Sequence, residues 1–103
     1  MKHLLILLSL LLLSSPVIGQ ETGVLYQYET SSGLVWETFG EKETHPKYEG
    51  DVENGVPNGL GFLTSPNGGK YIGEWKEGKP WNITIYGNSG IIIMKYVNGV
   101  EQK

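Results

Sequence analysis

The side chains best placed to do chemistry are three carboxylates that alternate along one short segment. Glu49, Asp51 and Glu53 are spaced two residues apart, so in a β-strand they share one face, with about 7 Å between neighbours at ~3.3 Å per residue. Glycoside hydrolases use pairs of carboxylates at similar separations. The solvated face of a strand explains the same spacing. We favour that interpretation, because a sheet of hairpins offers a surface rather than a cleft.

The other parts of a catalytic or metal site are missing from the sequence. The chain has no cysteine, and its histidines are His3, near the start, and His45, beside Pro46. Acyl-transfer enzymes need a nucleophile next to an oriented histidine, and a structural zinc site needs several cysteine or histidine ligands. We therefore expect a protein that is not an enzyme, with no catalytic residue, no metal and no cofactor.

Two tryptophans, Trp36 and Trp81, are the candidates for an interaction surface. An exposed aromatic ring on a sheet binds a carbohydrate ring or a protein partner. Core packing is the alternative, and we favour it for Tyr71 and Trp75. Asn82 begins the sequence Asn-Ile-Thr, which has the form of a glycosylation acceptor. We interpret this match as chance, and the sequence leaves open whether Asn82 is modified.

A repeat with a period of 23 residues positions these side chains. Residues 48–57 read YEGDVENGVP, and residues 71–80 read YIGEWKEGKP. A weaker third copy places Tyr96 where the second copy has Trp75. Such a period indicates a repeated supersecondary unit. We therefore divide residues 48–103 into units at 48–70 and 71–91 and a partial unit at 92–100.

Each unit is predicted to form a β-hairpin. Aromatic residues and glycine alternate with other residues, which predicts strands with one packed face and one mostly charged face. Each predicted turn ends in glycine: Asn54-Gly55, Glu77-Gly78 and Asn98-Gly99. Asn-Gly is the preferred pair for a type I′ turn. After its turn the second unit differs from the first, because Trp81 stands in the place of Asn58 and Asn-Ile-Thr at 82–84 in the place of Gly-Leu-Gly at 59–61. We expect its returning strand to pack differently.

The pattern Tyr-x-Gly-x-(Val/Trp)-x-x-Gly-x-Pro-x-Gly-x-Gly, complete at residues 48–61, resembles the MORN repeat. The resemblance covers roughly residues 47–100. It implies an all-β fold of stacked antiparallel β-hairpins in an elongated, twisted sheet, and a module for protein association or membrane attachment. The residues that would build the repeat are Tyr48, Gly50, Gly55, Gly59, Gly61, Tyr71, Gly73, Trp75 and Gly78.

The segments before the repeat have different characters. Residues 1–19 combine a short positive end with an apolar run over residues 4–13, which is typical of a signal peptide cleaved before Gln20. An uncleaved membrane anchor is the alternative, but a spanning helix requires about 20 apolar residues. We therefore expect an N-terminal signal helix and a secreted or periplasmic protein. Residues 20–47 are predicted to form one further hairpin, without the repeat pattern, and a polar connection.

The charge balance limits the classes of partner. The chain carries 11 acidic residues, 8 lysines and no arginine, for a net charge of −3. A nucleic-acid-binding protein needs clustered basic residues, so we expect no nucleic acid partner, and the acidity also disfavours contact with anionic membranes. We expect a scaffold or interaction surface for an unidentified protein partner, with a homo-oligomer also open. The alternative is a carbohydrate-binding or membrane-surface recognition module.

Overall fold

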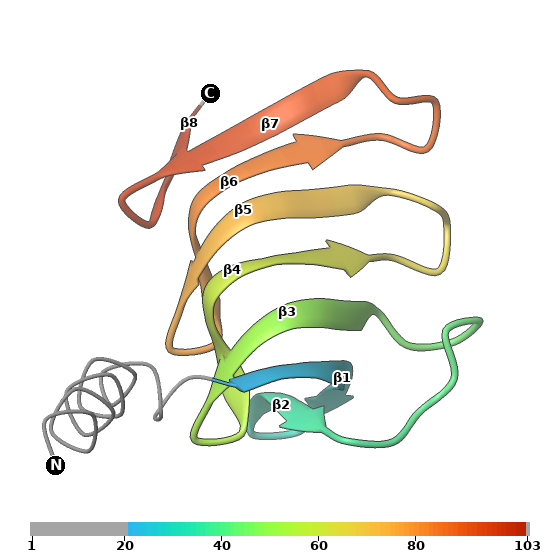
Figure 1. Ribbon diagram of the computed structural model, residues 1–103. Helices are drawn as coiled ribbons and strands as arrows, with labels where there is room; N and C mark the ends of the chain where they lie inside the picture. The colour runs from blue at the N-terminus through green and yellow to red at the C-terminus, as the bar shows by residue number, and fades with distance from the viewer. Residues whose placement is uncertain (1–20, 103) are drawn as a thin grey trace, which may run out of the picture.

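The computed structural model describes residues 21–102, which form one eight-stranded antiparallel sheet (Figure 1). The strands are β1 (Glu21–Thr30), β2 (Gly33–Glu37), β3 (Lys47–Glu53), β4 (Val56–Thr64), β5 (Lys70–Lys76), β6 (Lys79–Tyr86), β7 (Ile92–Val97) and β8 (Val100–Gln102). Their spatial order is β2-β1-β3-β4-β5-β6-β7-β8. The predicted all-β fold of antiparallel hairpins is confirmed.

The predicted signal peptide, residues 1–19, and its cleavage point before Gln20 lie outside the described residues. Within residues 21–102, no helix is long and apolar enough to cross a membrane.

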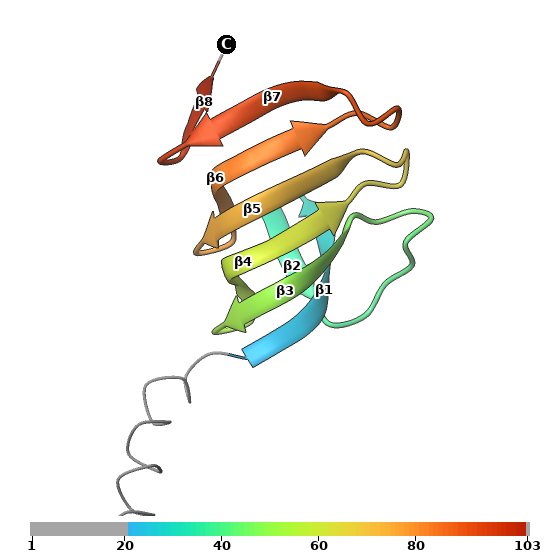
Figure 2. The same cartoon turned by 45° about the horizontal axis from the view of Figure 1, so that its top comes forward.

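The sheet curls into a half-barrel, as Figures 1 and 2 show. Strand β1 takes part in two pairings: residues 21–26 pair with β3, and residues 26–30 pair with β2. The hairpin of β1 and β2 thereby brings Trp36 to the inner face of the curl. The Trp36 ring makes edge contacts with Tyr48 and Trp75, with centroids 6.1 and 6.2 Å apart. This hairpin covers part of the inner face that the repeats leave open.

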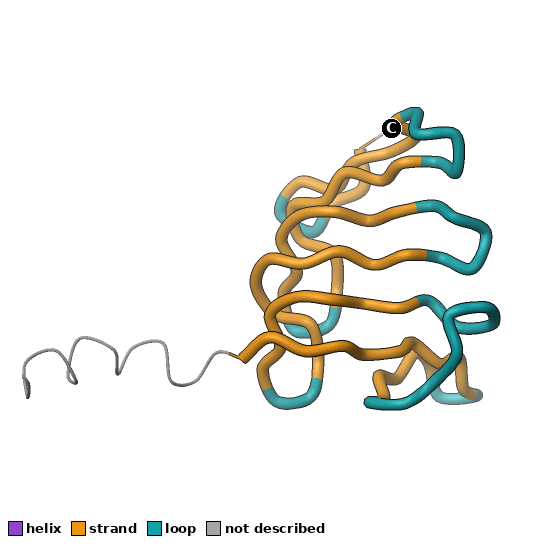
Figure 3. The backbone as a smooth tube through the Cα atoms, turned by 45° about the vertical axis from the view of Figure 1, so that its right-hand side comes forward, coloured by secondary structure: helices purple, strands orange, loops and turns teal. Residues whose placement is uncertain are grey.

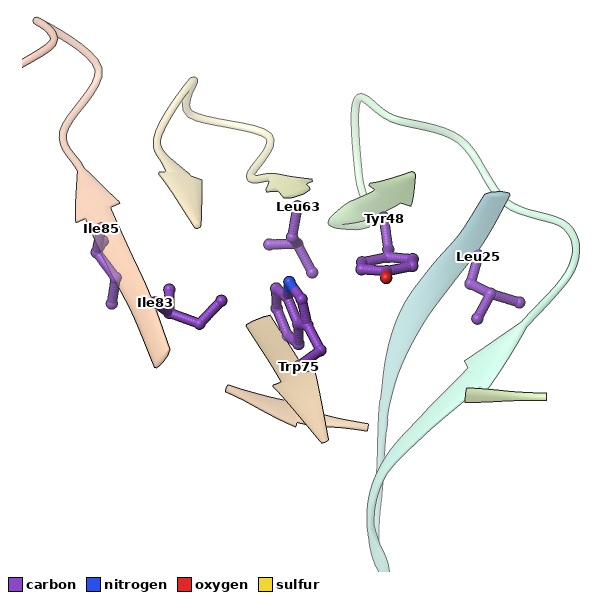
Figure 4. Packing of buried hydrophobic residues seen from close by; sticks show 6 residues of the cluster. All are labelled: Leu25, Tyr48, Leu63, Trp75, Ile83 and Ile85. Carbon is purple, nitrogen blue, oxygen red and sulfur yellow. The ribbon is translucent and has the colours of Figure 1, made fainter. Parts of the chain in front are cut away.

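The core lies on the inner face and is contributed by five strands. Its buried side chains project towards one another in Figure 4: Leu25, Tyr48, Leu63, Trp75, Ile83 and Ile85. Tyr48 and Trp75 contact edge to face at 5.3 Å and 79°, an arrangement that aromatic rings favour. Residues of successive strands meet in register, so the core runs continuously from β1 to β6.

Glycines make room for this core. Gly23, Gly50, Gly61 and Gly73 are cross-strand neighbours in a single row over β1, β3, β4 and β5. A Cβ atom on Gly61 would stand 2.6 Å from Cε1 of Tyr48, so only glycine fits under that ring. The Tyr48 hydroxyl donates to the carbonyl of Asp51 at 2.7 Å.

The three turns at residues 54–55, 77–78 and 98–99 have the predicted type I′ geometry. Asn54, Glu77 and Asn98 have φ values of 55°, 52° and 51°, and the following glycines have 79°, 83° and 82°. Figure 3 shows turns gathered at the ends of the strands. Neighbouring units are joined there, because the amide of Gly78 donates to the carbonyl of Pro57, and that of Gly99 donates to the carbonyl of Trp81, both at 2.8 Å.

The sequence alignment that places residues 82–84 of the second unit at residues 59–61 of the first is wrong in the structure. Ile83 lies opposite Gly73, as Gly61 lies opposite Gly50, so the counterpart of Gly61 is Ile83 rather than Thr84. The pairing is irregular in the second strand of each unit, β4 and β6. Counted from the turn glycine, the residue in the glycine row comes one position earlier in β6 than in β4. Ile83 then points into the core, where it is 2% exposed.

Candidate functional site

The outer face of the sheet carries an apolar patch, although the sequence predicts a mostly charged face. Val24, Phe62 and Ile72 belong to one cross-strand row, in which Glu49 separates Val24 from Phe62. They are 42%, 39% and 44% exposed, and Leu60, two residues from Phe62 on the same face of β4, is 68% exposed. We call Val24, Leu60, Phe62 and Ile72 the outer patch.

A shallow hollow of about 450 Å³ lies within the outer patch. Phe62 and Ile72 border it on one side and Leu60 on the other, because these residues belong to adjacent outward-facing rows. Its floor is the backbone of three members of the glycine row: Gly50, Gly61 and Gly73. The hollow therefore runs across three strands and has an apolar wall on each side.

The charged residues that line this hollow are both acids, Glu49 and Asp51. One oxygen of Asp51 accepts the amide of Leu60 at 3.0 Å, which holds the carboxylate at the rim. Glu49 lies 3.9 Å from the ammonium of Lys47 and is half-exposed. An exposed pair at this distance is weak, so Glu49 is available to another cation.

The third predicted acid, Glu53, faces a different hollow. Its carboxylate accepts from the side-chain amide of Asn58 at 2.8 Å, and it lines a space of about 720 Å³ at the hairpin tips. We call this space the tip hollow. The three alternating acids are therefore divided between two sites. They do not converge on one point, as the carboxylates of a glycosidase do.

Trp81 lines the tip hollow and is half-buried. The ammonium of Lys76 lies 4.3 Å from the centre of its ring. A Cβ atom on Gly99 would stand 2.8 Å from Cζ3 of the same ring. The tryptophan thus packs against the turn of the following hairpin, and a side chain of the protein itself covers part of its ring.

Trp36, the second candidate of the sequence, has a related environment. It is half-buried inside the curl, and its Nε1 atom would stand 3.1 Å from a Cβ atom on Gly78. Both candidate tryptophans therefore pack against a turn glycine. The repeat-building residues lie as follows: Tyr48 and Trp75 in the core, Tyr71 beside it, Gly50, Gly61 and Gly73 in the glycine row, Gly55 and Gly78 in turns, and Gly59 against Asp51.

His45 takes part in a small aromatic cluster. Its ring lies 4.1 Å from that of Tyr28, centre to centre, and its Nδ1 atom is 2.9 Å from the hydroxyl of Thr44. Tyr28 in turn donates to the carbonyl of Phe39 at 2.9 Å. Over residues 21–102, no three histidine, aspartate or glutamate side chains gather in a way that would hold a metal ion.

Sequence reasoning did not single out the outer patch. Ile72 and Phe62 are apolar residues at positions that the period-two pattern assigns to the charged, outward face. This disagreement is the feature of the sequence that could have indicated an apolar outer surface. An apolar residue in a strand usually indicates the core, so the register across β4 and β5 was needed to show that both side chains face outwards.

Comparison with known proteins gives one positive result. The family model of the MORN repeat matches residues 48–70 and 71–82. Neither a search of curated proteins nor a search of solved structures found a match. MORN repeats are β-repeat units of protein-interaction or membrane-associated modules. The matched residues include Leu60, Phe62 and Ile72 of the outer patch.

Proposed function

Because the chain is a MORN repeat protein, we propose that it is a non-enzymatic scaffold that binds a protein partner through the outer patch. The observation that carries this proposal is the exposure of four apolar side chains, 39% to 68%, on one face of three strands. Exposed apolar side chains that gather on one face of a small domain mark a contact site. Removal of that surface from water is the driving force for association.

The charges around the outer patch favour a protein partner over a lipid surface. Glu49 and Asp51 line the hollow, and carboxylates are repelled by anionic headgroups. A polar rim around an apolar centre is the usual arrangement of a protein interface. A lack of co-sedimentation with anionic vesicles at low salt would support this choice.

Two features support a non-catalytic role. The alternating acids face separate hollows, and Asp51 and Glu53 each accept a hydrogen bond from a neighbouring strand residue. His45 pairs with the hydroxyl of the adjacent Thr44 and lies against the ring of Tyr28, and the hollow that these residues line contains none of the three alternating acids. Asp51, Glu53 and His45 thus each have a structural partner, which favours a non-catalytic role.

We propose that this scaffold acts outside the cytoplasm, because residues 1–19 have the composition of a signal peptide. Mass spectrometry of the protein purified from its native source tests this step. A chain that begins at Gln20 would support export, and a chain that retains residues 1–19 would oppose cleavage.

Affinity capture with matched variants tests the proposed function. The tagged protein would be incubated with the extracellular or periplasmic fraction of its source, and retained proteins would be identified by mass spectrometry. Phe62→Ser should lose a partner that the wild type retains. Ile93→Ser is the control, because Ile93 is an exposed isoleucine on β7, outside the outer patch. If both variants retain the same proteins as the wild type, the outer patch is not the interface.

Carbohydrate binding at the tip hollow is the second candidate function. The tip hollow combines an aromatic ring, Trp81, with the carboxylates and amides of Glu53, Glu77 and Asn58, and such groups recognise sugars through stacking and hydrogen bonds. Lys76 covers the ring and would have to move. Binding on a glycan array that Trp81→Ala abolishes would favour this function, and an array without binding would exclude it.

A further inference from the structure

We propose that the hollow in the outer patch holds an arginine side chain of the partner, presented on an extended segment with an aliphatic residue two positions before the arginine and another two positions after it. This inference rests on the proposed function, since it names the chemistry that the outer patch recognises. It is carried by the shape of the hollow, by its apolar walls and by the two acids that line it.

The shape suits a long, narrow side chain. The floor is the bare backbone of Gly50, Gly61 and Gly73, and the walls are Leu60 on one side and Phe62 with Ile72 on the other. A volume of about 450 Å³ accommodates one large side chain and part of its backbone. An arginine carries three methylene groups that pack against apolar walls while its charged end reaches the rim.

The charges select a cation. Glu49 and Asp51 line the hollow, with no lysine, arginine or histidine among the lining residues. The two acids are separated by one residue on the outward face of β3, about 7 Å apart at ~3.3 Å per residue. A guanidinium group between them donates to both, because its five N–H groups spread in a plane. The compact ammonium of lysine matches one carboxylate at a time.

The apolar residues around the hollow determine which residue types should accompany the arginine in the partner segment. Val24 and Ile72 are half-exposed at 42% and 44%, and they extend the apolar surface to β1 and β5 on either side of the hollow. Alternate side chains of an extended segment share one face, so a segment that crosses the strands places the side chains two residues before and two residues after the arginine on Val24 and Ile72. Valine or isoleucine at those two positions would bury this surface, which stabilises the contact at about 25 cal/mol per Å².

A titration with synthetic peptides, followed by amide NMR spectra of the full chain, tests the inference. The probes are acetyl-Val-Gly-Arg-Gly-Val-amide and the same peptide with citrulline in place of arginine, which keeps the shape of the side chain and removes its charge. The arginine peptide should shift the amide signals of Gly50, Gly61 and Gly73 in a saturable manner. The citrulline peptide should bind at least about fivefold more weakly, as expected for the loss of a charge-assisted contact.

Two variants locate the charge dependence. Glu49→Gln and Asp51→Asn should each weaken binding of the arginine peptide about threefold or more, and Asn at position 51 keeps an oxygen for the amide of Leu60. Glu43→Gln is the control, because Glu43 is an exposed acid in the connection before β3. It should leave binding unchanged.

The inference is overturned if the two peptides bind equally, if the shifts occur around Trp81 instead, or if millimolar arginine peptide produces no shift. None of these outcomes would by itself contradict the proposed function, which has its own test. A partner that the wild type captures and Phe62→Ser loses would still establish the outer patch as an interface, with a different side chain in the hollow.

Discussion

The ring of Tyr48 lies against the backbone of Gly61, its diagonal neighbour on the next strand. A Cβ atom on Gly61 would stand 2.6 Å from Cε1 of Tyr48, and Tyr48 itself is fully buried. The tyrosine of one strand and the glycine of the next therefore form a single packing unit. On the inner face of the sheet this unit is part of the core, and on the outer face the backbone of Gly61 is part of the floor of the hollow.

Gly61→Ala should destabilise the fold by about 2 to 3 kcal/mol, because the added methyl group meets a buried ring that cannot move aside. Urea unfolding followed by tryptophan fluorescence measures this change. Gly23→Ala is the matched control in the same glycine row, where the nearest atom, Cγ2 of Val52, is 3.4 Å from the new Cβ. The control should change stability by less than about 0.5 kcal/mol. Equal effects of the two variants would contradict the packing unit.

Stability should fall as the pH rises from 10 to 12. Burial, reinforced by the charge of Asp51, raises the pKa of Tyr48 to about 12, above the value of about 10 in an unfolded chain. The native state holds the Tyr48 proton more tightly than the unfolded chain does. The stabilisation from the protonated hydroxyl is therefore complete below pH 10 and is lost as the pH rises towards 12. The expected loss is about 2 to 3 kcal/mol.

Urea unfolding at pH 8, 10 and 11.5 measures this dependence, with Tyr48→Phe as the comparison. The variant lacks the titrating hydroxyl and should show a flatter profile above pH 10. Its stability at pH 8 should be lower, because the hydrogen bond to the Asp51 carbonyl is lost. Profiles of equal slope would show that Tyr48 does not determine the alkaline transition.

Much of the fold follows from local patterns in the sequence. The alternation around Tyr48 and Tyr71 predicts strands, and the dipeptides ending in Gly55, Gly78 and Gly99 predict the type I′ turns that the structure contains. These features depend on residues that are close in sequence. The period also identifies the hairpin as the unit that is stacked.

Long-range features could not be predicted in the same way. The placement of Trp36 against Trp75 depends on how β1 divides its pairing between β2 and β3, which no local pattern specifies. The shift that makes Ile83 the counterpart of Gly61 arises from irregular pairing in β6. The outer patch was missed for a related reason, because an outward-facing Phe62 looks in sequence like a core residue.

Asn82→Ala should destabilise the last hairpin by about 1 to 2 kcal/mol. The side chain of Asn82 accepts from the amide of Asn98 at 2.9 Å and donates to Glu74 at 2.9 Å. Asn58 accepts from the amide of Glu77 in the same way, so these asparagines join consecutive units. Hydrogen exchange at the Asn98 amide should accelerate in the variant.

Asn88→Ala is the control for this exchange measurement, because Asn88 is an exposed turn residue before β7. It should leave the exchange of Asn98 unchanged. The engagement of Asn82 also predicts that this asparagine stays unmodified when the protein is secreted from eukaryotic cells. An intact mass that includes a glycan at Asn82 would contradict the structural role.

Glu77→Asn should stabilise the protein by about 0.5 kcal/mol. Glu77 has a φ of 52°, a conformation that asparagine adopts more easily than glutamate, and the other two turns already carry asparagine there. Thermal unfolding measures the change, with Glu43→Asn as a control that removes the same charge from an exposed connection. A lower melting temperature for Glu77→Asn would show that the glutamate side chain has a role of its own.

The affinity of the captured partner for outer-patch variants is the most direct test of the proposed function. Isothermal titration calorimetry would compare the wild type with Phe62→Ser, Ile93→Ser and Trp81→Ala. Truncation of a central aromatic anchor typically costs more than 1 kcal/mol, so Phe62→Ser should weaken binding about tenfold or more, and the other two variants should bind like the wild type. Unchanged binding by Phe62→Ser, or a loss confined to Trp81→Ala, would contradict the outer patch as the interaction surface.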